Sequence, residues 1–424
     1  MQRLLLAAGA GLAAMAVQGP AFGADSGDRA TVVATYADIA EAMYANSLSE
    51  AERLRTAIAD LVAKPSDETL EVARSAWLAA RVPYQQTEVY RFGNPIVDDW
   101  EGKVNAWPLD EGMIDYVAAS YGDESDINDL YTANVIANPQ ITASGATLDA
   151  STIDESLLRS LHEIDAVEAN VATGYHAIEF LLWGQDLHGT EAGAGARPAT
   201  DFDLANCTGG NCDRRIAYLT TAADMVVSDL QEIVDYWGEG GEAHAAVTGN
   251  PDDGLRAMLQ GLGSLSYGEF AGERMKLGLL LHDPEEEHDC FSDNTHNSHY
   301  YDIAGMLAVY DGRYERIDGS VVEGPSLADL VAAADPDLAG TTQNALDHTL
   351  AEAKTLKNAA DSGKMAYDQM LAEGNAEGNA MVEAVIAGLL EQTRHIEQVV
   401  GALDLGSLEF EGSDSLDDPE AVFQ

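Results

Sequence analysis

The sequence predicts an all-α protein of two four-helix-bundle-like domains that are related by an internal duplication. Alanine, leucine, glutamate and methionine are frequent, and alternating runs of β-branched residues are few, which favours helices over strands. Apolar residues recur at helical spacing over long segments. With 424 residues, 46% of them hydrophobic, the chain is long enough for two domains with cores of their own.

Helices are predicted wherever apolar residues recur with the helical period and charged residues lie between them. Pro65-Ser66-Asp67 ends the first helix, and the second is expected to return antiparallel to it. A loop, Gly93–Leu109, follows the second helix. The expected helices are Asp28–Ala63, Glu68–Phe92, Asp110–Tyr121, Leu157–Trp183, Leu346–Glu373 and Asn375–Leu403.

The duplication is suggested by residues that reappear at a constant offset of 185 positions. A duplicated helical unit would keep such an offset over many residues. The pairs are Asp28-Arg29 with Asp213-Arg214, Leu70 with Leu255, Glu88 with Glu273, and Gly93 with Gly278.

The first residues have the composition of a secretory signal peptide. Arg3 precedes the apolar run Leu4–Val17, and small residues follow at Ala21-Phe22-Gly23. That run is too short to span a bilayer, and no later run is long and apolar enough, so we expect an exported protein without a transmembrane segment. The expected segments are 1–23 signal peptide, 24–188 N-terminal domain, 189–212 linker, 213–410 C-terminal domain and 411–424 loose acidic tail.

The charge balance excludes nucleic acid as a partner. Acidic residues number 73 and basic residues 22, giving a formal net charge of −51. Such a surface repels nucleic acid and anionic membranes and attracts cations. It is explained either by adaptation to a salty exterior, where screening relieves the repulsion, or by a role in cation capture.

The three cysteines fit an oxidising compartment. Cys207 and Cys212 flank a flexible loop that a small disulfide could close, and a soft metal site is the alternative. Cys290 is predicted to be a free thiol.

His176 and Glu179 form the first candidate site. They are three residues apart in an otherwise apolar run, so on a helix they share one face. A neutral imidazole with a carboxylate suits zinc or iron, and the remaining ligands would come from elsewhere in the chain. The alternative is a buried histidine that is hydrogen-bonded to glutamate within a helical core.

Polar residues are densest between His282 and His299, where four histidines and six acidic residues fall within 18 positions. This segment is either a metal or ligand site or a solvated loop of an acidic protein. Two further glutamates, Glu88 and Glu273, have two interpretations. Either they are charges on helix surfaces, or a buried ion pair between glutamate and arginine joins the two halves of the chain, with Arg274 beside Glu273. The sequence contains no His-Glu-x-x-His, Gly-x-Ser-x-Gly, phosphate-binding loop or dinucleotide turn.

Gly174-Tyr175-His176-Ala177-Ile178-Glu179 resembles the Gly-x-His-x-x-Glu motif of the imelysin-like proteins, and Phe-Leu-Leu-Trp-Gly continues the match. Further segments fit in the same order, and the chain is most similar to the iron-regulated protein A type. These segments are Arg81–Phe92, Trp107-Pro108, Gly272–Met275 and Glu286–Thr295.

The resemblance implies two helical bundles with the motif near their interface. It also implies export, frequent induction by iron limitation, and a metallopeptidase label for the family. His176 and Glu179 carry over as metal ligands. The residues expected to line the same cleft are Glu88, Glu273, Arg274, His288 and Asp293.

These observations predict an exported iron-binding protein, periplasmic or associated with the outer membrane or cell surface, that takes part in iron acquisition. Iron is the expected metal, zinc the alternative, and a membrane iron transporter a possible partner. A second hypothesis is a metal-dependent peptidase in which Glu179 acts as general base or as a ligand to the metal that activates water. A third is a module that binds an organic ligand or siderophore, with His176 and Glu179 purely structural.

Overall fold

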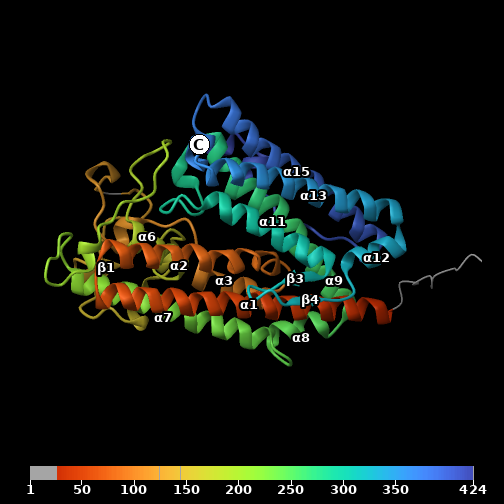
Figure 1. Ribbon diagram of the computed structural model, residues 1–424, viewed down its shortest axis with the longest axis horizontal. Coiled ribbons are helices and arrows are strands. Elements are labelled where there is room, and N and C mark those ends of the chain that lie inside the picture. The colour runs from red at the N-terminus through yellow and green to blue at the C-terminus, as the bar shows by residue number, and fades with distance from the viewer. Residues whose placement is uncertain (1–25, 124, 144, 424) are drawn as a thin grey trace, which may run out of the picture.

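The computed structural model describes residues 26–123, 125–143 and 145–423 (Figure 1). The predicted signal peptide, 1–23, lies outside them. The fold is all-α, as predicted, with two short antiparallel hairpins, β1–β2 (Gln140–Ala143, Ala146–Asp149) and β3–β4 (Arg313–Glu315, Val321–Glu323). None of the helices in the described ranges has the length and apolar character that crossing a bilayer requires.

One group of helices contains most of the first half of the chain. The long helix α1 (Ser26–Ala63) packs along both α2 (Asp67–Gln85) and α7 (Cys212–Trp237), and these form the lower part of Figure 1. Other elements surround this group: η1 (Glu88–Tyr90), α3 (Pro95–Asn105), α4 (Glu111–Ile114), η2 (Ala119–Tyr121), α5 (Glu155–Leu161), η3 (Ile164–Ala166), α6 (Gly174–Trp183), η4 (Ala199–Phe202) and α8 (Glu242–Thr248).

The second group lies above the first in Figure 1 and is centred on α11 (Thr295–Asp311), α13 (Pro336–Asp361) and α15 (Ala376–Ala402). α9 (Pro251–Ser264) and the π-helical η5 (Leu265–Leu277) run between the groups, since α9 contacts both α1 and α15. The remaining elements are α10 (Gly278–Leu281), η6 (Pro284–Glu286), α12 (Leu327–Ala334), α14 (Tyr367–Leu371), α16 (Asp414–Asp417) and η7 (Ala421–Phe423).

Helix α2 has a capped start and a buried face that includes polar side chains. Ser66 and Thr69 form a capping box at its start. Its apolar residues recur at helical spacing on the face that contacts α1, but two polar side chains, Arg81 and Gln85, are buried on it as well. Buried polar groups need partners, so this face leads to the candidate site.

The predicted linker, 189–212, does not separate the two groups. The chain beyond it begins with α7, which was expected in the C-terminal domain but packs along α1 and α6. Helices α7 and α9 do begin close to the positions that the 185-residue offset gives for α1 and α2. The duplication itself stays a prediction.

Several predicted helices are shorter in the structure. The helix expected over Leu157–Trp183 is broken into α5, η3 and α6, because Glu163, Asp165 and Ala166 have positive φ. The one expected over Asp110–Tyr121 is limited to α4 and η2. The helices expected over Glu68–Phe92 and Leu346–Glu373 each end early and continue as a further short helix, η1 and α14 respectively.

The C-terminal segment is docked, so the expectation of a loose tail is wrong. The Ser415 hydroxyl donates to the Gly272 carbonyl oxygen over 2.9 Å, and Ser413 and Ser415 are both buried. A Cβ on Gly272 would lie 2.3 Å from the Ser413 Cβ, so this close approach requires glycine.

The cysteines are arranged as predicted. Cys207 and Cys212 form a disulfide, with their Cα atoms 6.0 Å apart, and Cys290 is a half-buried free thiol. The disulfide closes the loop that leads into α7.

Candidate metal centre

The candidate site begins with the geometry of Gly174, the first residue of α6. Its φ is +85°, and an added Cβ would lie 2.5 Å from the carbonyl oxygen of Val104. Only glycine fits both conditions without strain. All ten residues of α6 are buried, so His176 and Glu179 lie inside the protein.

Within α6, His176 and Glu179 are bonded to each other as their spacing predicted. The distance from His176 Nδ1 to Glu179 Oε2 is 3.0 Å. The other carboxylate oxygen, Oε1, accepts from the backbone N–H and the hydroxyl of Ser292, over 3.0 and 2.7 Å. His176 Nε2 is buried and has no hydrogen-bond partner among the described residues.

The loop between η6 and α11 brings two more potential ligands to His176. One nitrogen of each of His176 and His288 and one oxygen of Asp289 lie within 4.8 Å of one another. Asp289 Oδ1 is 3.5 Å from His288 Nδ1 and 4.0 Å from His176 Nδ1. The two imidazole rings stand edge to face, with centroids 4.8 Å apart.

The Asp289 side chain is held by three donors. Arg81 donates to Oδ1 over 2.9 Å, Asn294 donates to Oδ2 over 2.8 Å, and Ser298 also donates to Oδ2. The Asp289 backbone N–H donates to Thr295 Oγ1 over 3.0 Å, which fixes the turn before α11. The loop therefore presents Asp289 in one defined position.

Arg81 connects this group to a second buried network. Its guanidinium donates to Asn105 Oδ1 over 2.6 Å, and Asn105 donates to Glu88 Oε1 over 3.3 Å. Glu88 Oε2 forms a 2.6 Å ion pair with Arg274, and Arg274 lies 3.3 Å from Asp302 Oδ2. The buried Glu–Arg pair joining the two halves, one of the alternatives for these residues, is thus present.

Burial and charge perturb the titratable groups of the site. Burial and the Arg81 cation lower the pKa of His176 to about 3, and burial lowers the pKa of His288 well below its usual value. Burial and the neighbouring Asp289 carboxylate raise the pKa of Glu179, whereas Arg81 and Ser292 act in the opposite direction. Both imidazoles are therefore neutral at pH 7, which is the form that binds metals.

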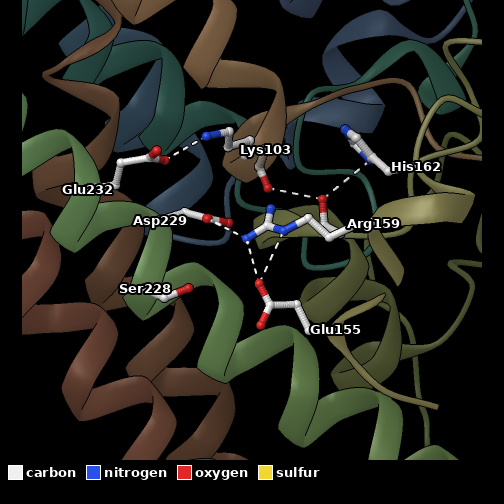
Figure 2. A pocket seen from close by; sticks show the side chains of 8 residues that line it. Lys103, Glu155, Arg159, His162, Ser228, Asp229 and Glu232 are labelled. Carbon is white, nitrogen blue, oxygen red and sulfur yellow. Dashed lines mark hydrogen bonds and ion pairs between the residues drawn. The ribbon is translucent and has the colours of Figure 1, made fainter. Parts of the chain in front are cut away.

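A cavity of about 510 Å³, drawn in Figure 2, lies elsewhere, between α3, α5 and α7. Its charged residues satisfy one another: Lys103 pairs with Glu232 over 2.6 Å, and Arg159 pairs with Asp229 over 2.5 Å. This arrangement is that of ion pairs bordering a surface groove.

A cavity of about 440 Å³ reaches the candidate site from the surface, and His288 and Arg274 line its inner part. Trp107 also lines it, edge-on to His288, and its indole N–H donates to the Glu287 carbonyl oxygen over 3.0 Å. Six carboxylates and two arginines, Arg91 and Arg274, line the cavity, so the acidic groups are in excess and its field attracts cations. The carboxylates are Asp98, Asp99, Glu101, Glu163, Glu168 and Glu269.

Three of the five residues expected to line the cleft are at the site: Glu88, Arg274 and His288. Glu273 is half-buried and turned away toward Glu286, whose pKa its charge raises. Asp293 belongs to another group of carboxylates, with Asp186 and Asp368.

Of the four histidines between residues 282 and 299, His288 is the one that meets His176. His282 contacts the Leu371 carbonyl oxygen over 2.6 Å, and His296 contacts Asp361 over 3.2 Å. His299 is buried between Phe270 and Tyr367. One of the four histidines of this segment therefore meets His176, and the other three have different neighbours.

Asp289, Arg81 and Ser292 are site residues that were not predicted individually from the sequence. Each falls inside a segment that carried the family resemblance, Arg81–Phe92 or Glu286–Thr295. Asp289 adjoins His288, and that adjacency of two ligand types was the available signal.

Comparison with known proteins assigns the chain to a family. The family model for imelysin, which also carries a peptidase label, matches residues 40–396. The chain belongs to the imelysin family. The matched range contains α6 and the loop that carries His288 and Asp289.

Individual relatives agree with this assignment. Iron-regulated protein A of Synechococcus elongatus is 32% identical over 76 residues, which is 18% of this chain and 21% of that protein. The match therefore spans about a fifth of that relative's length.

Two solved structures share the fold. A protein described as an iron-regulated protein A precursor, from Parabacteroides distasonis, has a TM-score of 0.63 at 17% identity, covering 89% of this chain and 96% of its own. An imelysin-like protein from Psychrobacter arcticum has a TM-score of 0.57 at 16% identity, covering 90% and 98%.

Proposed function

We propose that this imelysin-family protein is exported and binds iron for iron acquisition, with His176, His288 and Asp289 as its protein ligands. The observation that carries the proposal is the convergence on one buried point of His176 with the neighbouring His288 and Asp289, which lie 112 and 113 residues further along the chain. Two neutral imidazole nitrogens and a carboxylate oxygen suit divalent iron, and zinc is the alternative metal.

In this proposal Glu179 positions His176. When Glu179 is ionised it only accepts hydrogen bonds, so His176 Nδ1 carries the proton and Nε2 keeps a free lone pair. A carboxylate behind a metal-bound imidazole is a common outer partner of metal sites. Nε2 is buried without a partner and is free to bind a metal, whereas Nδ1 is the nitrogen that lies 4.0 Å from Asp289 Oδ1.

The acidic cavity supports capture of a cation. A metal ion entering past its six carboxylates would reach His288 first, because that ligand lines the cavity. The Arg81 guanidinium beside Asp289 opposes a bound cation, so the site would hold iron less tightly than one without it. Moderate affinity suits a protein that passes its metal on, for instance to a membrane transporter.

The peptidase alternative has less support in the geometry. Glu179 was the candidate general base, but its two oxygens are engaged by His176 and Ser292. A general base needs an oxygen that is free to take a proton from water. An organic ligand such as an anionic siderophore would be repelled by the cavity lining.

The test is equilibrium dialysis of the chelator-stripped mature protein against ferrous iron under anaerobic conditions at high salt, where surface carboxylates bind little. The wild type should retain one iron per chain, and His176→Ala and His288→Ala should each lose it. His348→Ala is the matched control, since His348 faces Glu352 at 3.7 Å on the exposed side of α13. Equal iron retention in all four proteins would refute the proposal.

A further inference from the structure

A second group of acidic side chains lies on the other side of the loop that carries His288 and Asp289. Carboxylate oxygens of Asp186, Asp293 and Asp368 lie within 4.8 Å of one another. Asp186 follows α6, Asp293 is in the 287–294 loop and Asp368 is in α14. Three separate segments thus contribute one carboxylate each.

Glu287 adds a fourth carboxylate to this group. Its side chain is fully buried, and the polar side chains that it approaches are the Asp368 carboxyl group and the Thr295 hydroxyl, so no cationic group faces it among the described residues. It lies against Asp368, and the charges of Asp368 and Asp293 both act on it. One oxygen of Asp368 and one of Asp293 are buried as well, and that of Asp293 has no hydrogen-bond partner among the described residues.

Without a cation, these carboxyl groups reduce their mutual repulsion by binding protons, since burial raises the pKa values of Glu287, Asp293 and Asp368. Buried carboxylates are normally paired with a base or bound to a metal. Within the described residues, no lysine or arginine forms an ion pair with any of the four, in contrast to Asp289 with Arg81 and Glu88 with Arg274. The basic neighbour is His188, half-exposed, which contacts Asp186 over 2.8 Å.

We propose that Asp186, Glu287, Asp293 and Asp368 form a second metal site that binds a hard divalent cation of the Ca²⁺ type. An all-oxygen, multi-carboxylate set matches Ca²⁺, which takes six to eight oxygen ligands in flexible geometry. Asp186 and Asp293 are only half-buried, so water can supply further ligands. The set contains no nitrogen ligand, which distinguishes it from the centre at His176.

A bound cation would hold the 287–294 loop, which carries His288 and Asp289, in one position. Glu287 and Asp293 flank His288 and Asp289 in sequence, and Asp293 also accepts from the Gly193 backbone N–H over 3.0 Å. Binding would tie this loop to α14 and to the segment after α6. The second site would therefore hold the iron ligands in place without touching iron.

The experiment is calorimetric titration of the chelator-stripped mature chain with CaCl₂ at high NaCl. The wild type should bind one Ca²⁺ with a Kd below about 1 mM, the weak limit for extracellular calcium modules. The double variant Asp186→Asn/Asp368→Asn should bind at least about tenfold more weakly, since ligand charge sets affinity. Glu383→Gln, an exposed carboxylate of α15, should bind like the wild type.

Thermal melting distinguishes a variant that has lost Ca²⁺ binding from one that has failed to fold. In chelator, the double variant should melt at or above the wild-type temperature, because repulsion between the carboxylates is removed. Calcium should raise the melting temperature of the wild type and leave that of the variant unchanged. If the double variant does not fold, Asp293→Asn is titrated in its place with the same expected weakening.

Two results would overturn the proposal: no stoichiometric Ca²⁺ binding by the wild type at high salt, or unchanged affinity in the aspartate variants. His176→Ala separates this site from the iron centre, since it should lose iron and keep Ca²⁺. Loss of Ca²⁺ binding in His176→Ala would show that the second site is not independent.

Discussion

Glu179 Oε2 lies 3.0 Å from His176 Nδ1, and this contact orients the imidazole from inside its own helix. The same carboxylate receives two hydrogen bonds from Ser292, 113 residues further along the chain. Glu179 therefore links the motif helix to the loop that supplies the other two proposed ligands.

This link predicts that Glu179→Gln weakens iron binding without abolishing folding. Glutamine has one acceptor oxygen instead of two and carries no charge, so it cannot accept from both His176 and Ser292, and the imidazole becomes a weaker ligand. Loss of such an outer partner typically costs about 10- to 100-fold in metal affinity. Iron titration of the variant measures the effect.

Glu352→Gln is the control for that titration, because Glu352 faces the exposed His348. It should leave iron affinity unchanged. An affinity of Glu179→Gln equal to that of the wild type would mean that the carboxylate does not act on the metal.

Gly174→Ala is predicted to destabilise the protein by about 2 kcal/mol or more. The positive φ alone costs a side-chain-bearing residue about 1–2 kcal/mol, and the contact with Val104 adds to it. Urea denaturation measures the change. In Gly340→Ala, where nothing lies near the added methyl in α13, stability should stay the same or rise by up to about 1 kcal/mol.

Contacts in the site between residues close together in the sequence could be predicted, whereas contacts between distant residues could not. His176 and Glu179 were predicted as a pair because their contact is local, one turn of a helix. Asp289 was missed because nothing in its neighbourhood shows that a residue 113 positions away will meet it. Its partners Arg81 and Ser298 come from two further helices, so packing of the whole chain decides the site.

The break before α6 could not be predicted either. The segment Leu157–Ala172 has no proline or glycine, and its apolar spacing continues that of a helix. The turn depends on Glu163, Asp165 and Ala166 in the left-handed region, which no residue type there favours strongly. The Glu163 backbone N–H donates to the Asn170 carbonyl oxygen over 2.9 Å, and this hydrogen bond holds the turn in the folded protein.

The Glu88–Arg274 pair gives a third prediction. Arg274→Met leaves Glu88 and Asp302 buried without their cation, which typically costs about 3–5 kcal/mol. The double variant Glu88→Gln/Arg274→Met should lose less stability than the sum of the two single variants. Unfolding in urea tests this.

An exposed ion pair is the control for the buried Glu88–Arg274 pair. Arg394 and Glu391 are both more than half exposed on α15, so Arg394→Met should change stability by at most about 1 kcal/mol. A similarly small effect for Arg274→Met would contradict the buried network as described.

Glu101 gives a prediction of pH dependence. Burial raises its pKa from 4.5 to about 7, against the lowering effect of Arg91, so the folded state binds a proton that the unfolded state has released. Between about pH 4.5 and 7 this makes stability fall as pH rises. Glu101→Gln should lose less stability than the wild type between pH 5 and pH 8.

Equal losses for the two proteins over that range would contradict the shift of the Glu101 pKa. Histidines and other groups titrate in both proteins, so their contribution cancels in the comparison.

We propose that His176, His288 and Asp289 hold one iron ion, and an anomalous difference map of iron-loaded crystals at the iron edge tests this. We expect one strong peak bounded by these three side chains, absent from crystals of His176→Ala. No peak there, or a peak of equal strength in the variant, would contradict it.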